Sequence, residues 1–265
     1  MTETRVRRTD PVPAPAETPA DPGVDEARFG LRDARILGLV LLSTAWVQRH
    51  ALGAFFSSPD DLIHLQQAAG LKPTLATPFR FLSQVLYFRM MYMLVGPNPR
   101  AFHLVTYGLH LVNVVLVYAL ARSFGVRRVI AGAAAGLFGA FPLFLVLLSS
   151  GVGMNDELAL TLAIAALLVL ERPGRAARVA ASALFTLAMI CKESVLFLPL
   201  LALVPRGGAT RSAAARRVAP LLVIAACFAI LFFVLRPSGL APDRVIYAMQ
   251  FGPNLFHNLM TYLCW

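Results

Sequence analysis

Two adjacent carboxylates, Asp60 and Asp61, follow the first apolar stretch of a chain that has few other acids. After Asp33 only seven acidic residues remain, and these two are among them. Ionisable side chains at membrane depth are costly, so those that occur there are candidates for function. A carboxylate can take the proton of an attacking hydroxyl group, and the pair therefore predicts general-base chemistry.

Other charged residues in apolar surroundings could support such chemistry. Arg80 and Lys192 are candidates for binding a phosphate, because guanidinium and ammonium groups pair with phosphate oxygens. The alternatives are that Arg80 extends to lipid headgroups and that Lys192 pairs with its neighbour Glu193. Asp156 and Glu157 precede an apolar stretch, where they are either accessory site residues or a helix cap. Glu193 is a third candidate for an accessory site residue.

The composition indicates a membrane protein. Mean hydropathy is +0.68, 58% of residues are hydrophobic and only 14% are charged, which does not suit a soluble domain. The net charge of +10 comes from arginines that cluster in short loops between apolar stretches, a pattern of membrane orientation. We therefore expect contact with membrane lipids and none with nucleic acid.

The predicted fold class is an all-α, polytopic membrane protein. Residues 1–33 are rich in Pro, Ala and charge, so we expect a disordered cytoplasmic tail, followed by a multi-span domain over 34–265. FHNLMTYLCW opens one more apolar segment near Asn254, and we expect the chain to continue beyond it. At about 20 residues per crossing, the predicted spans are 36–56, 101–121, 129–148, 158–170, 179–204 and 218–235.

The stretch 179–204 conflicts with the positive-inside rule if it crosses once, because both of its flanks are basic. A break at Lys192-Glu193 resolves the conflict by making two short helices with the charged pair at their apex. Pro199 also weakens the second half as a regular helix. The apex, the loop 57–100 and the loop 149–157 then lie outside the cytoplasm.

Three shorter patterns predict local structure. The string PFRFLSQVLYFRMMYMLVG, from Pro78, mixes apolar, aromatic and basic residues, which is typical of an interfacial helix. His103, His110 and Asn113 share one helical face, where core hydrogen bonding is the simpler interpretation and metal ligation the alternative. GAAAG, from Gly132, favours close contact between helices.

Four strings occur in order along the chain: SPDD, RFLSQVLYFRMMYMLVGPNPRAFHLVTYGLHLVNVVLVYAL, FGAFPLFLVLLSSGVGMNDELALTLAIAALL and FTLAMICKESVLFLPLLAL. Together they resemble the GT-C membrane glycosyltransferases, and within them the protein O-mannosyltransferase-like and tetratricopeptide-linked mannosyltransferase-like members. The resemblance covers residues 36–265. Phe81 departs from it, since such proteins often carry Pro at this place in an R-P-L-S-like string.

The resemblance implies transfer of a sugar, with mannose as one candidate, from a polyprenyl-phosphate-linked donor. The acceptor would be a protein, a lipid or a cell-envelope glycan, and the anomeric carbon would be inverted at the extracytoplasmic face of a bacterial inner membrane. Asp60 matches the acid that begins the family's first outer loop, which makes it the expected general base. Asp61 would orient the acceptor, bind a divalent metal or be the base itself. The alternative for both is a helix start capped by Ser58.

Two other functions compete with the glycosyltransferase. A transporter or lipid flippase would also show broken helices and buried charges, although the sequence has no internal repeat of the kind found in many transporters. A structural subunit without catalytic activity would explain the spans but would leave the outer carboxylates without a task.

Overall fold

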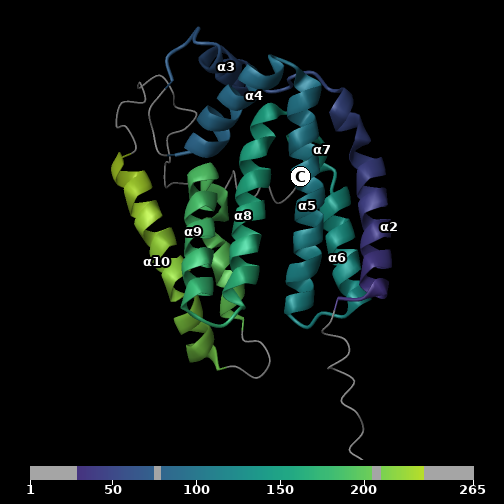
Figure 1. Cartoon of the computed structure of the whole chain (residues 1–265), viewed down its shortest axis with the longest axis vertical. Helices are drawn as coiled ribbons and strands as arrows, with labels where there is room; N and C mark the ends of the chain where they lie inside the picture. The colour runs from purple at the N-terminus through teal and green to yellow at the C-terminus, as the bar shows by residue number, and fades with distance from the viewer. Residues whose placement is uncertain (1–28, 75–78, 205–209, 236–265) are drawn as a thin grey trace, which may run out of the picture. The chain divides into compact units, whose positions relative to one another are not determined.

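The computed structural model describes residues 29–74, 79–204 and 210–235 (Figure 1). Every regular element in these ranges is helical, so the all-α prediction is confirmed for the described part of the chain. Within these described ranges, three helical stretches are long and apolar enough to cross a membrane: Pro99–Ser123, Gly151–Leu170 and Arg211–Phe232. Of the predicted tail, residues 1–28 lie outside the described residues, whereas Leu31 to Asp33 already belong to the first helix. The segment near Asn254 also lies outside the described residues.

The helices belong to two compact units, one formed by Met1–Lys72 with Arg89–Glu157 (unit 1) and one by Pro73–Phe88 with Leu158–Trp265 (unit 2). The helices of unit 1 are α2 (Leu31–Gln48), η1 (Arg49–Gly53), α3 (Pro59–Ala68), α5 (Pro99–Ser123), α6 (Arg128–Ala140), α7 (Leu143–Leu148) and η3 (Gly151–Gly153). Those of unit 2 are η2 (Phe81–Leu86), α9 (Arg175–Cys191), η4 (Glu193–Leu203) and α10 (Arg211–Leu235). The chain passes between the units after Lys72, within α4 (Tyr87–Val95) and within α8 (Met154–Leu170).

Small residues let the helices of unit 1 approach closely. A Cβ atom at Gly132 would overlap the side chain of Ile36 on α2, and one at Gly139 would overlap Thr44. Ala131 and Ala135 are fully buried against Tyr118. The predicted close contact at GAAAG is therefore confirmed, with α2 as the partner helix.

The predicted single span over 129–148 is wrong, because the structure breaks it into α6 and α7. Phe141 adopts an extended conformation and Pro142 follows it, which agrees with the way proline disfavours helix at the preceding residue. The break leaves carbonyl groups at the end of α6 without helical partners. Gln48 donates to two of them, Gly139 O at 3.0 Å and Phe141 O at 3.2 Å.

The predicted break at Lys192-Glu193 is confirmed in unit 2. α9 ends at Cys191, Lys192 is extended, and η4 begins at Glu193. η4 is a 3-10 helix of 11 residues with Pro199 inside it, whereas runs longer than about four residues are uncommon for this geometry. α9, η4 and α10 pack on one another.

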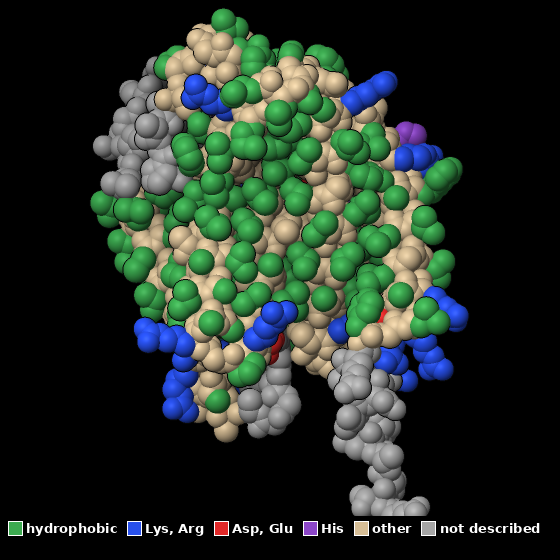
Figure 2. All heavy atoms as spheres, in the orientation of Figure 1, with side chains coloured by type: hydrophobic (Ala, Val, Ile, Leu, Met, Phe, Trp, Pro, Cys, Tyr) green, Lys and Arg blue, Asp and Glu red, His purple; other side chains and the backbone are tan. Residues whose placement is uncertain are grey.

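The predicted span 36–56 is covered by α2, which runs from Leu31 to Gln48, and by the 3-10 helix η1, which ends at Gly53. Along α2, Leu39, Leu42 and Trp46 are largely exposed. Figure 2 shows hydrophobic side chains over the middle of α2 and α6 in unit 1, with Lys and Arg toward the helix ends. Such exposed apolar area suits a lipid environment better than water.

Residues 81–95 of the predicted interfacial string are helical, with the π-helix η2 followed by α4. Its position at a membrane surface stays a prediction. η2 is tied to the end of α9 by Ser83, whose hydroxyl donates to Cys191 O at 2.7 Å.

Candidate functional site

Asp60 and Asp61 lie in the first turn of α3, which Ser58 caps. The Ser58 hydroxyl accepts a hydrogen bond from the Asp60 N–H at 3.2 Å. In return, the Asp61 carboxylate accepts from the Ser58 N–H at 3.3 Å. The predicted helix start is therefore confirmed as a capping box, with Asp61 as its acid.

Asp61 is fully buried and its carboxylate is surrounded by uncharged donors. Ser150 Oγ lies 3.0 Å and 3.2 Å from its two oxygens, and the Val152 N–H donates to it at 2.8 Å. Nearby, Ser57 Oγ donates to Ser149 O at 2.8 Å. Asp61 thus ties the start of α3 to η3. It connects the loops 57–100 and 149–157, which are both predicted to lie outside the cytoplasm.

Asp60 has the opposite surroundings, although it is the adjacent residue. Its side chain is exposed. Within the described residues, its carboxylate takes part in no hydrogen bond or ion pair. Successive residues of a helix point about 100° apart, so α3 turns Asp61 into unit 1 and Asp60 toward its surface. Of the two acids, Asp60 is the one open to a substrate.

His103 of α5 lies beside the enclosed Asp61. The ring is fully buried, its centroid is 6.0 Å from that of Phe56, and the Asp61 carboxylate interacts with it electrostatically. Among the described residues, neither ring nitrogen has a hydrogen-bond partner at ordinary geometry. The ring does lie near the backbone of Ala54 and Phe55, and the core hydrogen bonding expected for this histidine stays a prediction.

Glu157 forms a buried cluster with His110 and Asn113. Its Oε1 lies 3.0 Å from His110 Nδ1, and Asn113 Nδ2 donates to its Oε2 at 2.6 Å and its carbonyl oxygen at 2.9 Å. His110 Nε2 lies 3.1 Å from Gly139 O. Core hydrogen bonding is confirmed for His110 and Asn113.

The geometry of this cluster fixes how many protons it holds. A carbonyl oxygen can only accept, so His110 Nε2 carries a proton that it donates to Gly139 O. One more proton must lie between His110 Nδ1 and Glu157 Oε1, because two lone pairs would repel. The pair is then neutral in total, either as imidazolium with carboxylate or as imidazole with carboxylic acid.

The other predicted accessory residue, Asp156, is half-buried in the first turn of α8. Its neighbour Asn155 is buried, and the Asn155 Oδ1 atom has no partner among the described residues. Acids in the first turn are favoured by the helix dipole. An accessory role for Asp156 and Glu157 stays a prediction.

In unit 2, Arg80 and Glu193 form a two-pronged ion pair. Arg80 Nε donates to Glu193 Oε2 at 3.1 Å, and Arg80 Nη2 donates to Oε1. Each side chain is about one-third exposed, at 36% and 32%. Arg80 has φ 57° and ψ 18°, and it is the described non-glycine residue with a left-handed backbone. This is the place where Phe81 departs from the resembled pattern.

Lys192, a half-buried residue, also interacts electrostatically with the Glu193 carboxylate. Two cations, Arg80 and Lys192, therefore meet around one acid at the break between α9 and η4. Arg80, Lys192 and Glu193 were all candidate site residues from the sequence. The sequence did not predict that Arg80 contacts Glu193, which lies 113 positions further along the chain. The pairing of Lys192 with Glu193 and the binding of a phosphate are compatible uses of the same cluster.

The predicted site residues thus form two groups. Asp60, Asp61, Asp156 and Glu157 belong to unit 1, and Arg80, Lys192 and Glu193 belong to unit 2. In the part of the chain that the structure covers, no three His, Cys, Asp or Glu side chains converge as metal ligands. The alternative in which His103 and His110 bind a metal ion therefore has no group of three ligands among the described residues.

Comparisons with known proteins found no match to this chain. No protein-family model matches the chain, and neither a curated protein nor a solved structure matches it. A function for the chain must accordingly be argued from its residues and their surroundings.

Proposed function

We propose that this chain is a membrane glycosyltransferase that uses Asp60 as its general base. The observation that carries the proposal is the contrast at the start of α3: Asp60 is exposed without a side-chain partner in the described region, whereas Asp61 is enclosed by three donors. A general base needs a free carboxylate on a firmly held backbone. Asp61 is the positioning residue that holds this backbone.

The proposed reaction transfers a sugar from a polyprenyl-phosphate donor to a hydroxyl group of the acceptor. The acceptor oxygen attacks the anomeric carbon while the bond from that carbon to the phosphate oxygen breaks. The hydroxyl proton passes to Asp60, and the bonding electrons leave with the polyprenyl phosphate. Attack from the side opposite the leaving group inverts the anomeric carbon. The acceptor is a protein, a lipid or a cell-envelope glycan, and mannose is the first sugar to test.

The departing phosphate needs cations, and Arg80 with Lys192 are the proposed source. Both cations interact with the carboxylate of Glu193, which holds them near one another. Arg80 is one-third exposed and already oriented for two parallel hydrogen bonds, the geometry that guanidinium offers to a phosphate. Phosphate oxygens would compete with Glu193 for these donors as negative charge develops on them.

The orientation of the site is proposed from the arginines. Three regions rich in arginine, at helix ends and in the connections between helices, are assigned to the cytoplasm by the positive-inside rule. This assignment leaves α3 and the apex at Lys192 outside the cytoplasm. We propose that the site faces outward from the cytoplasm, and that the membrane is a bacterial inner membrane. The arginines concerned are Arg122, Arg127, Arg128, Arg172, Arg175, Arg178, Arg206, Arg211, Arg216 and Arg217.

The proposal is tested by sugar transfer in the full-length protein with a polyprenyl-phosphate-sugar donor. Asp60→Asn keeps the shape of the side chain but removes the base, so donor binding should survive while transfer falls by roughly a hundredfold or more. Asp60→Glu is the matched control, because it keeps a carboxylate and should retain more transfer than Asn. Equal transfer by wild type and Asp60→Asn would rule out Asp60 as the base.

The phosphate cluster has its own test. Lys192→Ala should reduce turnover or donor affinity by on the order of tenfold to a thousandfold, because a cation beside the leaving phosphate acts most as charge develops. Lys192→Arg keeps the charge and serves as the control. Unchanged kinetics in Lys192→Ala would leave Lys192 with a structural task only, the pairing with Glu193.

A transporter or lipid flippase is the second candidate, favoured by the broken element α9–η4 with charges at its apex. Broken helices commonly line the substrate sites of transporters. Proteoliposomes separate the two functions: a flippase moves labelled polyprenyl-phosphate-sugar across the bilayer with its sugar still attached. Movement without any transfer to an acceptor would favour the flippase.

A further inference from the structure

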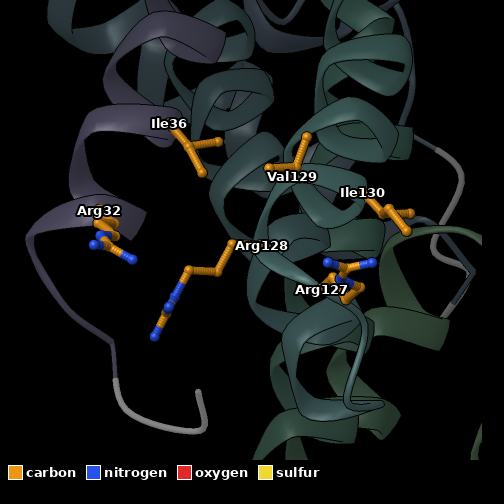
Figure 3. Close-up of a pocket in the computed structure, with 6 residues that line it drawn as sticks. All are labelled: Arg32, Ile36, Arg127, Arg128, Val129 and Ile130. Atoms are coloured by element: carbon orange, nitrogen blue, oxygen red, sulfur yellow. The ribbon is translucent and has the colours of Figure 1, made fainter. Parts of the chain in front are cut away.

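A cavity of about 490 Å³ opens where α2 and α6 begin, at the end of unit 1 where Asp33 lies. Its lining is half basic and half aliphatic: Arg32, Ile36, Arg127, Arg128, Val129 and Ile130 (Figure 3). The volume is within the range of small-ligand sites, which is about 300–1,000 Å³. The lining indicates a ligand that is anionic at one end and apolar at the other.

Two helix N-termini add to the positive character of the cavity. α2 begins at Leu31 and α6 at Arg128, so Arg32 and Arg128 each stand in the first turn of a helix. The first N–H groups of a helix have no partner within it, and the helix dipole places partial positive charge there. Helix N-termini of this kind favour phosphate groups.

Among the described residues, the acid at this end is Asp33, and its carboxylate is already engaged. Asp33 is fully buried, accepts from Tyr118 Oη at 2.5 Å, and pairs with Arg128 at 3.0 Å and Arg122 at 3.4 Å. Arg32 and Arg127 are exposed, and neither has an acidic partner within the described residues. Their two charges are therefore available to a ligand.

The aliphatic half of the lining is also open. Val129 is 74% exposed and Ile130 is 56% exposed, beside the half-buried Ile36. A free inorganic anion would use the arginines and leave this surface uncovered, whereas an anion with hydrocarbon chains would cover both halves. Basic pockets between membrane helices bind anionic headgroups for this reason.

We propose that this cavity binds an anionic phospholipid. The headgroup phosphate lies between Arg32 and Arg127 and near the start of α6, and the acyl chains lie along Ile36, Val129 and Ile130. The site is independent of sugar transfer and of Asp60. It anchors α2 to α6 through a lipid at the basic end of unit 1.

The test uses the full-length protein, stripped of lipid in detergent and titrated with phosphatidylglycerol, phosphatidylcholine or inorganic phosphate, with bound lipid counted by native mass spectrometry. The variant is Arg32→Gln with Arg127→Gln, both exposed and outside the Asp33 pairs. The charge-matched control is Arg35→Gln with Arg100→Gln, two exposed arginines of unit 1 that do not line the cavity. Protein folding is checked by thermal unfolding of both.

The expected result is that Arg32→Gln with Arg127→Gln weakens phosphatidylglycerol binding by roughly tenfold to thirtyfold, from the loss of two charges near a headgroup, while the control binds as wild type. Val129→Ser with Ile130→Ser should also weaken phosphatidylglycerol binding, because the acyl chains lose their contact. Phosphatidylglycerol binding that survives in the arginine variant would overturn the proposal. An equal loss in the control would also overturn it and assign the effect to net charge. Displacement of phosphatidylglycerol by millimolar inorganic phosphate would mean a free-phosphate site in place of a lipid site.

Discussion

The two ends of α2 lead to two carboxylates that unit 1 buries by different means. Asp33, in the first turn of α2, is surrounded by two arginines and a tyrosine hydroxyl. Asp61, beyond the other end of α2, is held by a serine hydroxyl and two backbone N–H groups, with no cation among these donors. At each end, open charges stand beside the buried acid: Arg32 and Arg127 beside Asp33, and Asp60 beside Asp61.

This contrast shows that charged residues close to one another in unit 1 have different roles, one structural and one in binding. The buried acid fixes the local structure, and the open charge of the same end is left for a ligand. The ligand differs in sign, because the open groups are cations near Asp33 and a carboxylate near Asp61. Three substitutions of buried acids in unit 1 test the structural half of this division, in order of expected effect.

Glu157→Ala should have the largest effect on stability. It leaves His110 and Asn113 buried without their shared partner, and breaking a buried pair costs about 3–5 kcal/mol. Glu157→Gln is the control: its amide can donate to His110 Nδ1 and accept from Asn113, so most of the loss should be restored. Thermal unfolding in detergent measures both. A glutamine variant as unstable as the alanine variant would contradict the shared-proton account of this pair.

Asp61→Ala should come next. It removes the acceptor of Ser150, Val152 and Ser58, and an unsatisfied buried polar group costs about 1–3 kcal/mol. Asp60→Ala is the matched control on the same turn, and exposed substitutions usually change stability by less than about 0.5 kcal/mol. Equal stabilities of the two alanine variants would break the division between the buried and the open acid.

The pH dependence of stability should distinguish Asp33, with a smaller effect. Burial alone would raise the pKa of Asp33, but its hydrogen bonds from Tyr118 and the Gly30 N–H, with Arg128 and Arg122, outweigh burial and hold the pKa below its ordinary value. A lowered pKa in the folded state stabilises the fold above the unfolded pKa, and this stabilisation is lost as the pH falls through the folded pKa.

Acid unfolding followed below about pH 4, near the unfolded pKa of an aspartate, provides the measurement for Asp33. Wild type should lose stability over this range, and Asp33→Asn should lose less of it, from a lower starting point. Identical acid dependence in the two proteins would show that Asp33 gains nothing from its arginines.

The sequence predicted features that local chemistry decides. Lys192-Glu193 breaks an apolar stretch because two charged residues cannot rest in mid-bilayer, and Ser58 caps α3 because its hydroxyl suits a helix start. Gly132 allows close contact because it lacks a Cβ atom. Pro142 is also a local signal, because proline disfavours helix at the preceding residue. The apolar residues on both sides of Pro142 nevertheless favoured one continuous span, so the end of α6 was not predicted.

The sequence could not predict pairings between distant positions. Asp61 meets Ser150 across 89 positions and His110 meets Glu157 across 47, and neither separation leaves a periodic pattern. For the same reason the sequence left Asp60 and Asp61 equivalent, since only the packing of α3 decides which acid turns inward. Arg80 meets Glu193 by the same kind of distant contact.

The central claim is that Asp60 performs chemistry and Asp61 holds it in place. It is tested most directly by the rate of sugar transfer per folded molecule, measured side by side for Asp60→Asn and Asp61→Asn in the full-length protein. We expect Asp60→Asn to be as folded as wild type and to transfer sugar at about one-hundredth of the wild-type rate or below. We expect Asp61→Asn to be less stable, with its folded fraction still active. Wild-type transfer by Asp60→Asn, or a folded Asp61→Asn protein without transfer, would contradict the account.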